Sequence, residues 1–146
     1  MTVAQPKTLT GQQFELKRGF AHDWDEYPVI VSDIMPGVLR QSVANDNLML
    51  SRIEYLPGGG VPLHSHAAQQ VIIMISGTMT LTVGEETSEI TAGEFGFVPG
   101  WAPHALISKD GCVFLEAATP TRVEYLTGYI GPTAQVLNLN KEESKA

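Results

Sequence analysis

The sequence predicts an all-β domain, and three observations support that prediction. Short apolar or alternating runs recur along the chain between glycines and prolines, at the spacing of about 8–12 residues that is typical of sandwiches and barrels. Strict alternation places Met79, Leu81 and Val83 on one face and threonines on the other, as a half-buried strand requires. No segment keeps a helical period over several turns, so we expect no long helix.

The expected strands follow from these runs in chain order. The first, 48–56, alternates and ends at Pro57 and three glycines, which favour a turn. The next run, 71–75, ends at a Ser-Gly pair and is expected to be separate from the strand that follows it. The remaining strands are expected at 78–83, 87–90, 94–98, 104–107, 112–117 and 125–131.

The length of 146 residues indicates one domain with tails. We expect an extended N-terminal arm over 1–23, a β-barrel over 24–130 and a charged C-terminal tail over 131–146.

Composition and charge exclude several classes of function. A net charge of -7 and a pI near 4.9 disfavour nucleic acid as a partner. No apolar run is long enough to span a membrane, and the first residues lack the apolar centre of a signal peptide. The single cysteine, Cys112, excludes an intrachain disulfide and fits a reducing cytoplasm. Its apolar surroundings indicate a buried hydrophobe rather than a nucleophile.

The histidines predict a metal site. Three of the four lie in two segments, GGGVPLHSHAAQQ and PGWAPHAL, as His64, His66 and His104. A strand points residues i and i+2 to the same face, so His64 and His66 can bind one ion. The alternative is that these are ordinary buried histidines with hydrogen-bonding roles. The fourth, His22, is flanked by aspartate and is expected at the surface or in a turn.

The spacing around these histidines resembles the cupin superfamily. The first cupin motif is G-x(5)-H-x-H-x(3,4)-E-x(6)-G. This chain matches every spacing, with Gly58, His64, His66 and Gly77 in place and Gln70 where the motif has glutamate.

The second cupin motif, G-x(5)-P-x-G-x(2)-H-x(3)-N, is matched in part. Gly93, Pro99 and His104 agree with it, whereas Trp101 stands at the inner glycine and Ser108 at the asparagine. The resemblance implies a cupin-type double-stranded β-barrel, or jelly roll, with a metal inside its mouth. It agrees with the strand pattern found without it.

Gln70 changes the chemistry that the motif would otherwise imply. A carboxylate would remove one unit of charge from the ion, whereas an amide that binds through its carbonyl oxygen leaves the charge near +2. Such a centre suits Lewis-acid chemistry or the capture of an anion. Alternation should turn the neighbouring Gln69 to the opposite face. The competing interpretation is that three histidines hold the ion and Gln70 only packs nearby.

A narrower resemblance, over 24–126, is to the small KdgF-type cupins of pectin and alginate breakdown. It is carried by the P-x-H-S-H run with its following glutamine, by the turn from Pro99 to His104, and by the late segment from Glu116 to Leu126. These enzymes open 4,5-unsaturated monouronates to linear keto sugars. The resemblance implies a catalytic role for Glu116, at a position where the family has aspartate, and a substrate contact for Arg122. Ala118 stands where the family has phenylalanine.

The local pattern is compatible with these roles. Alternation places Cys112, Phe114 and Glu116 on one face, so a carboxyl group in an apolar barrel beside a cation could act as a general acid or base. Arg122 could bind a substrate carboxylate with its guanidinium. The alternatives are a solvent-exposed Glu116 and an Arg122 paired with Glu124 at the surface. Candidates for the pocket wall are Met74, Phe95, Phe97 and Trp101.

Together these features predict a cytoplasmic cupin that binds one divalent transition metal (zinc, nickel, manganese, iron or copper) through His64, His66, Gln70 and His104. The expected activity is an isomerase or ring-opening step on a small, anionic, carbohydrate-derived substrate such as an unsaturated monouronate. A dioxygenase, a polyketide-cyclase-like enzyme and a non-catalytic ligand-binding module are the alternatives. Open sheet edges and an arm able to cover a neighbour's edge predict a homodimer.

Overall fold

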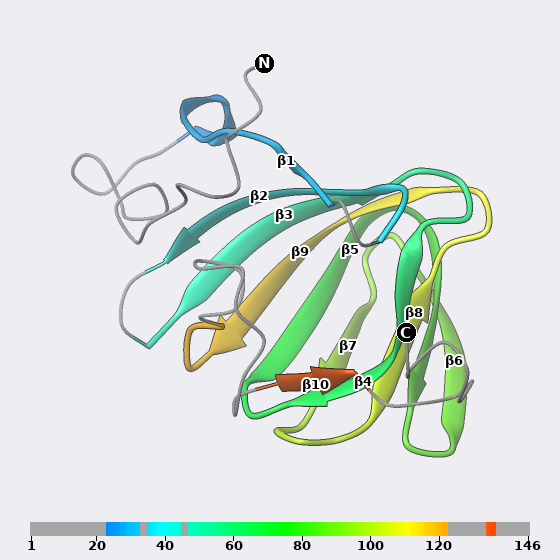
Figure 1. Ribbon diagram of the computed structural model, residues 1–146. Coiled ribbons are helices and arrows are strands. Elements are labelled where there is room, and N and C mark those ends of the chain that lie inside the picture. Colours follow the sequence, from blue (N-terminus) through cyan, green and yellow to red (C-terminus); the bar gives the residue numbers. More distant parts are fainter. Residues whose placement is uncertain (1–22, 33–34, 45–46, 123–133, 137–146) are drawn as a thin grey trace.

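The computed structural model is built almost wholly of β-strands (Figure 1). It describes residues 23–32, 35–44, 47–122 and 134–136. Within these ranges, ten antiparallel strands form one sheet that curls into a half-barrel, which confirms the all-β prediction. A single 3-10 turn, Trp24–Glu26, precedes the sheet in the described part. No helix there is both long enough and apolar enough to cross a membrane.

The strand order brings distant parts of the chain together. β9 lies between β3 and β5, and the full path runs β1-β2-β3-β9-β5-β8-β4-β10, with β6 and β7 also paired to β5. The bounds are β1 Ile30–Val31, β2 Val38–Ala44, β3 Met49–Tyr55, β4 Gly60–His66, β5 Gln69–Val83, β6 Glu86–Thr91, β7 Phe95–Val98, β8 His104–Ile107, β9 Cys112–Thr119 and β10 Ala134–Val136.

The predicted break after 71–75 is wrong, because β5 continues through it for 15 residues. Gly77 does adopt the left-handed conformation that a turn signal predicts, with φ +79. A Cβ there would press against the carbonyl oxygen of Gly111 and the backbone of Cys112. The pairing of β5 with β9 shifts register between Met74 and Ser76, so the glycine bends the strand without ending it.

Two described strands on the N-terminal side, β1 and β2, were not predicted from the sequence. Nearly all of β2 is buried, and Arg40 and Ser42 occupy buried positions of the strand, which hides the usual apolar signal. β10 lies inside the expected tail 131–146 and pairs with β4. The strand expected over 125–131, most of the arm over 1–23, and His22 lie outside the described residues.

The interior of the half-barrel divides into an apolar part and a polar part. Phe114 and Tyr55 meet edge to face at the centre of the larger apolar cluster, with ring centroids 5.1 Å apart. Burying side chains of this size stabilises a fold by about 1.5–3 kcal/mol each. Further along β9, Glu116 is the next inward residue, so the same alternation carries the strand from the apolar core into the polar region.

Candidate metal centre

The three predicted histidines converge inside the half-barrel. His64 and His66 lie two residues apart on β4, and His104 at the start of β8 pairs directly with His64. All three are buried, and one ring nitrogen from each lies within 4.8 Å of the others. Ligands about 2.0–2.1 Å from one ion lie at most about 4.2 Å apart, so only small side-chain adjustments are needed for all three nitrogens to bind one ion. The predicted convergence is therefore confirmed.

Local hydrogen bonds set the tautomer of each ring. The Nδ1 atoms of His64, His66 and His104 lie 2.7–2.8 Å from the carbonyl oxygens of Pro62, Ala68 and Ala102. A carbonyl oxygen only accepts, so each Nδ1 carries the proton and donates it. Each Nε2 consequently keeps a free lone pair, which is the form in which imidazole binds a metal.

Burial also keeps the rings neutral. Desolvation, aided by the neighbouring His104, lowers the pKa of His64 to about 3. Desolvation, aided by Arg122, lowers the pKa of His66 to about 4. Desolvation lowers the pKa of His104 as well. A metal therefore meets unprotonated ligands at neutral pH.

Gln70, four residues beyond His66, has an unsatisfied amide oxygen. Among the described residues, the buried side-chain polar atoms without a hydrogen-bond partner are His66 Nε2, His104 Nε2 and Gln70 Oε1. Buried polar atoms are nearly always paired, and all three of these atoms belong to predicted metal ligands. Two nitrogens of this kind, the third histidine and an amide oxygen form a donor set that fits a divalent transition metal.

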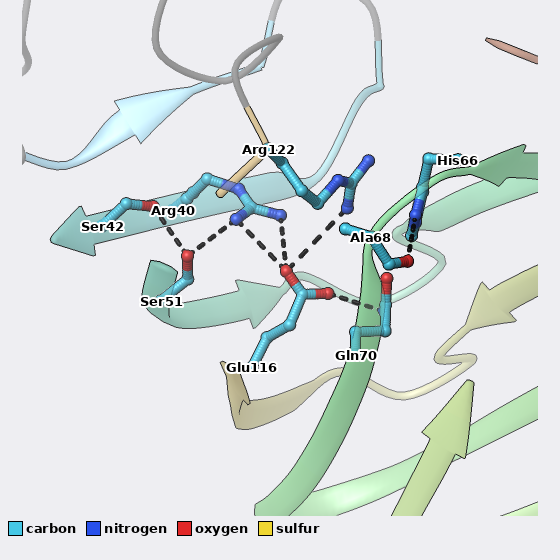
Figure 2. A network of polar contacts seen from close by, with 8 residues as sticks. All are labelled: Arg40, Ser42, Ser51, His66, Ala68, Gln70, Glu116 and Arg122. Carbon is cyan, nitrogen blue, oxygen red and sulfur yellow. Dashed lines mark hydrogen bonds and ion pairs between the residues drawn. The ribbon is translucent and has the colours of Figure 1, made fainter. Parts of the chain in front are cut away.

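The neighbouring Glu116 is buried, not solvent-exposed, with 4% of its surface accessible. Figure 2 shows its carboxylate between Gln70 and Arg40. Gln70 Nε2 donates to Glu116 Oε2 at 2.8 Å. Both terminal nitrogens of Arg40 lie 3.4 Å from Glu116 Oε1. The predicted alternation along β9 therefore directs Glu116 to the metal side of the interior.

Arg122 is buried in the same network. Its Nη1 lies 4.0 Å from Glu116 Oε1, and 5% of its surface is exposed. The alternative of an exposed Arg122 is thus wrong, while Glu124 lies outside the described residues.

Arg40, with Ser51 and Ser42 behind it, was missed from the sequence. Arg40 Nη1 donates to Ser51 Oγ at 2.8 Å, and Ser51 Oγ is 2.8 Å from Ser42 Oγ. The signal was available in VLRQSVA, where Arg40 and Ser42 alternate in phase with Val38. If that run is interpreted as a strand, alternation predicts that the charged side chain of Arg40 points inward.

The prediction of the pocket wall is wrong for three of its four residues. Phe95, Phe97 and Trp101 are 68%, 52% and 48% exposed. Alternation in β7 turns Gly96 and Val98 inward instead of the phenylalanines. Met74 is buried, but in the larger apolar cluster.

Comparison with known proteins agrees with this geometry. The Cupin domain model matches residues 51–117, which include every predicted metal ligand. No curated protein matches the sequence.

Several solved structures share the fold. An RmlC-like cupin from Shewanella frigidimarina is 24% identical with a TM-score of 0.65, over 75% of this chain and 96% of that one. KdgF from Halomonas sp. is 20% identical with a TM-score of 0.63, over 70% and 95%. The polyketide cyclase RemF from Streptomyces resistomycificus is 20% identical with a TM-score of 0.68, over 88% and 94%. The half-barrel is thus the cupin fold, as the motifs predicted.

Proposed function

We propose that this chain is a metal-dependent cupin enzyme whose centre is formed by His64, His66, Gln70 and His104. The observation that carries the proposal is the convergence of three buried histidines, together with buried, unpaired ligand atoms on two of them and on Gln70, namely His66 Nε2, His104 Nε2 and Gln70 Oε1. When bound, a divalent ion at these atoms supplies a Lewis acid for a hydroxyl or carbonyl oxygen.

The proposed substrate is small, acidic and derived from a carbohydrate, such as an unsaturated monouronate. Arg122 is buried beside the site, where its guanidinium could bind a carboxylate through two parallel hydrogen bonds. KdgF is among the proteins with this fold, which supports an isomerase or ring-opening step. Ala118 is fully buried where the KdgF-type resemblance has phenylalanine, and we propose that this smaller side chain alters the substrate preference.

Glu116 is the proposed proton-transfer group. Its carboxylate is the acidic group nearest the amide of Gln70, with 2.8 Å between Oε2 and Nε2. Both of its oxygens accept hydrogen bonds, from Gln70 and Arg40. Because each carboxylate oxygen can accept a second hydrogen bond, a substrate proton could reach Oε2 while Gln70 and Arg40 stay in place.

A polyketide-cyclase-like reaction is the second candidate, supported by the overlap with RemF along most of both chains. A dioxygenase and a non-catalytic binding module remain from the sequence alternatives. The dependence of turnover on oxygen and on the metal separates these candidates. An isomerase works without oxygen and with several divalent ions, a dioxygenase consumes oxygen, and a binding module retains ligand without turnover.

Metal content is the first test. We expect about one divalent metal per chain in the purified protein and its loss in the double variant His64→Ala/His104→Ala. Gln70→Ala should weaken metal binding at least tenfold, whereas the matched control Gln69→Ala should not, because Gln69 is exposed on the opposite face. Elemental analysis and calorimetry with Zn²⁺ measure both.

Turnover of 4,5-unsaturated monouronates under nitrogen then tests the reaction. Loss of the absorbance of the unsaturated substrate, abolished in the histidine double variant, supports the isomerase. Turnover that occurs only in air and consumes oxygen contradicts it. A protein that takes up no metal contradicts the proposed centre altogether.

A further inference from the structure

The orientation of the Gln70 amide decides whether it can bind a metal. An amide has one acceptor atom and one donor group, and only the oxygen can act as a ligand. In this structure Nε2 donates to Glu116 Oε2, and Oε1 is the atom left without a partner. Rotating the amide by half a turn would put the NH₂ group where the oxygen now lies and abolish ligation.

Glu116 is in turn held by donors on its other side. Arg40 reaches Oε1 with both terminal nitrogens at 3.4 Å, while Ser51 accepts from the same guanidinium at 2.8 Å. The pairing of the strands explains this arrangement, since Ser51 of β3 lies directly opposite Glu116 of β9. A group at position 116 must therefore present an acceptor to Arg40.

The register of β5 places Gln70 within reach. Glu116 pairs directly with Ile72, two residues from Gln70 on the same face, and such diagonal neighbours are close enough for long side chains to meet. Both side chains are almost completely buried. Glu116 is therefore the partner of the Gln70 amide in a region shielded from bulk water.

We infer that Glu116 is a positioning residue for the metal centre: it accepts from Gln70 Nε2 and so directs Gln70 Oε1 toward the three histidines, while Arg40 holds its other oxygen. The inference rests on the proposed metal site but assigns Glu116 a role that is present before any substrate binds. Figure 2 shows the chain of contacts from Ser42 to Gln70.

The variant Glu116→Gln tests this role, because Arg40 selects its orientation. The new carbonyl oxygen should face Arg40, which leaves the new NH₂ group facing Gln70. Gln70 must then turn its oxygen to that group and its own NH₂ to the histidines. We expect the affinity for Co²⁺ to fall at least tenfold, with one oxygen neighbour lost from the cobalt X-ray absorption spectrum.

The same substitution in a Gln70→Glu background should have the opposite effect. There, two carboxylates face each other, and Glu116→Gln replaces a repulsive neighbour by a donor. A carboxylate at position 70 can accept from that donor and still offer its second oxygen to cobalt. We therefore expect Glu116→Gln to weaken Co²⁺ binding beside Gln70 and to strengthen it beside Gln70→Glu.

This reversal of sign separates positioning from simpler effects. Loss of a nearby negative charge, or general destabilisation, would weaken cobalt binding in both backgrounds. Glu89→Gln, which makes the same change at an exposed position of β6, should leave affinity unchanged in both. Calorimetry with Co²⁺ on the four proteins and the two control variants gives the comparison.

Weakening in both backgrounds, or no change in either, overturns the positioning role and leaves the metal site standing. A wild-type protein that takes up no Co²⁺ overturns both. If Glu116→Gln does not fold, side-chain NMR of the wild type decides. A Zn²⁺-dependent shift of the Gln70 side-chain carbonyl carbon, with its amide protons still protected from exchange, supports the role, and no such shift overturns it.

Discussion

At the scale of single residues, each histidine of the site is set for metal binding by its neighbour two residues away. The carbonyls of Pro62, Ala68 and Ala102 each fix one tautomer. This arrangement needs no distant contact, because it arises from the local strand and turn geometry. The distant contacts instead determine Gln70, whose partner Glu116 lies 46 residues away in the chain.

Neutral buried histidines make the stability of the metal-free protein depend on pH. The folded pKa values of His64 and His66, about 3 and about 4, lie below the ordinary histidine pKa of 6.5. The unfolded chain therefore binds more protons between pH 6.5 and about 4. The free energy of unfolding should fall as the pH falls through this window, by up to about 1.4 kcal/mol per pH unit for each histidine.

Urea unfolding at several pH values between about 7 and about 5, with a chelator present, measures this slope. The variant His64→Gln/His66→Gln removes both titrating rings and should flatten it. An equal slope in the variant would mean that other groups cause the pH dependence.

The residue types and spacing predicted from the sequence that three histidines meet, whereas the polar network behind them was not predicted. For His64 and His66 the local pattern is sufficient, since strand alternation alone puts both side chains on one face. Arg40 meets Glu116 only because β2, β3 and β9 are neighbours, and strand order is not encoded in local periodicity. The inward position of Arg40 was therefore not predicted, because its strand was not predicted.

At the scale of elements, the turn before β8 departs from the cupin motif at Trp101. This residue has φ +62, in the left-handed region where the motif has glycine. Its backbone N–H donates to the carbonyl oxygen of His66 at 2.7 Å, which ties the two histidine segments together. A side chain in that conformation costs about 1–2 kcal/mol.

Replacing Trp101 by glycine should relieve that cost while the hydrogen bond to His66 persists. We expect Trp101→Gly to leave the free energy of unfolding unchanged or to raise it by up to about 1 kcal/mol. Phe97 is similarly exposed, at 52% against 48%, but lies within β7. The control substitution Phe97→Gly should lower the free energy of unfolding by about 1 kcal/mol, because glycine weakens a strand.

Chemical denaturation of both variants makes the comparison. Equal destabilisation by the two substitutions would mean that contacts of the indole outweigh the backbone conformation.

Strand prediction succeeded where one face is apolar and failed where tertiary contacts override a local signal. The run 104–107 matches β8 at both ends. At Gly77 the local conformation was anticipated, but β9 pairs with β5 up to this residue, and β6 and β8 pair with β5 beyond it, so the strand stays continuous. Turn residues thus predict backbone conformation more directly than they predict where a strand ends.

At the scale of the whole molecule, apolar side chains gather on the outer face of β5 and β7. Ile73 of β5 pairs directly with Phe95 of β7, and Phe97 lies two residues further along. Their exposed fractions are 41%, 68% and 52%. Single exposed apolar residues are ordinary, whereas adjacent ones indicate a contact surface.

We expect the protein to be a homodimer at micromolar concentration, with this face in the contact. The double variant Phe95→Lys/Phe97→Lys should dissociate it, because paired lysines would repel across a two-fold interface. Analytical ultracentrifugation measures the masses, and Thr87→Lys/Glu89→Lys, exposed on β6, is the control. A monomeric wild type would contradict the prediction.

The place of β9 between β3 and β5 has a consequence during synthesis. β3 is complete at Tyr55, but the strand that covers its second edge is made only when translation reaches Thr119. Until then the nascent chain presents an unpaired strand edge, the kind of surface on which other chains add. The hairpin of β2 and β3 therefore cannot be covered by β9 until translation has passed Thr119. During the interval between the synthesis of β3 and that of β9 the nascent chain can misassemble, however stable the native fold is.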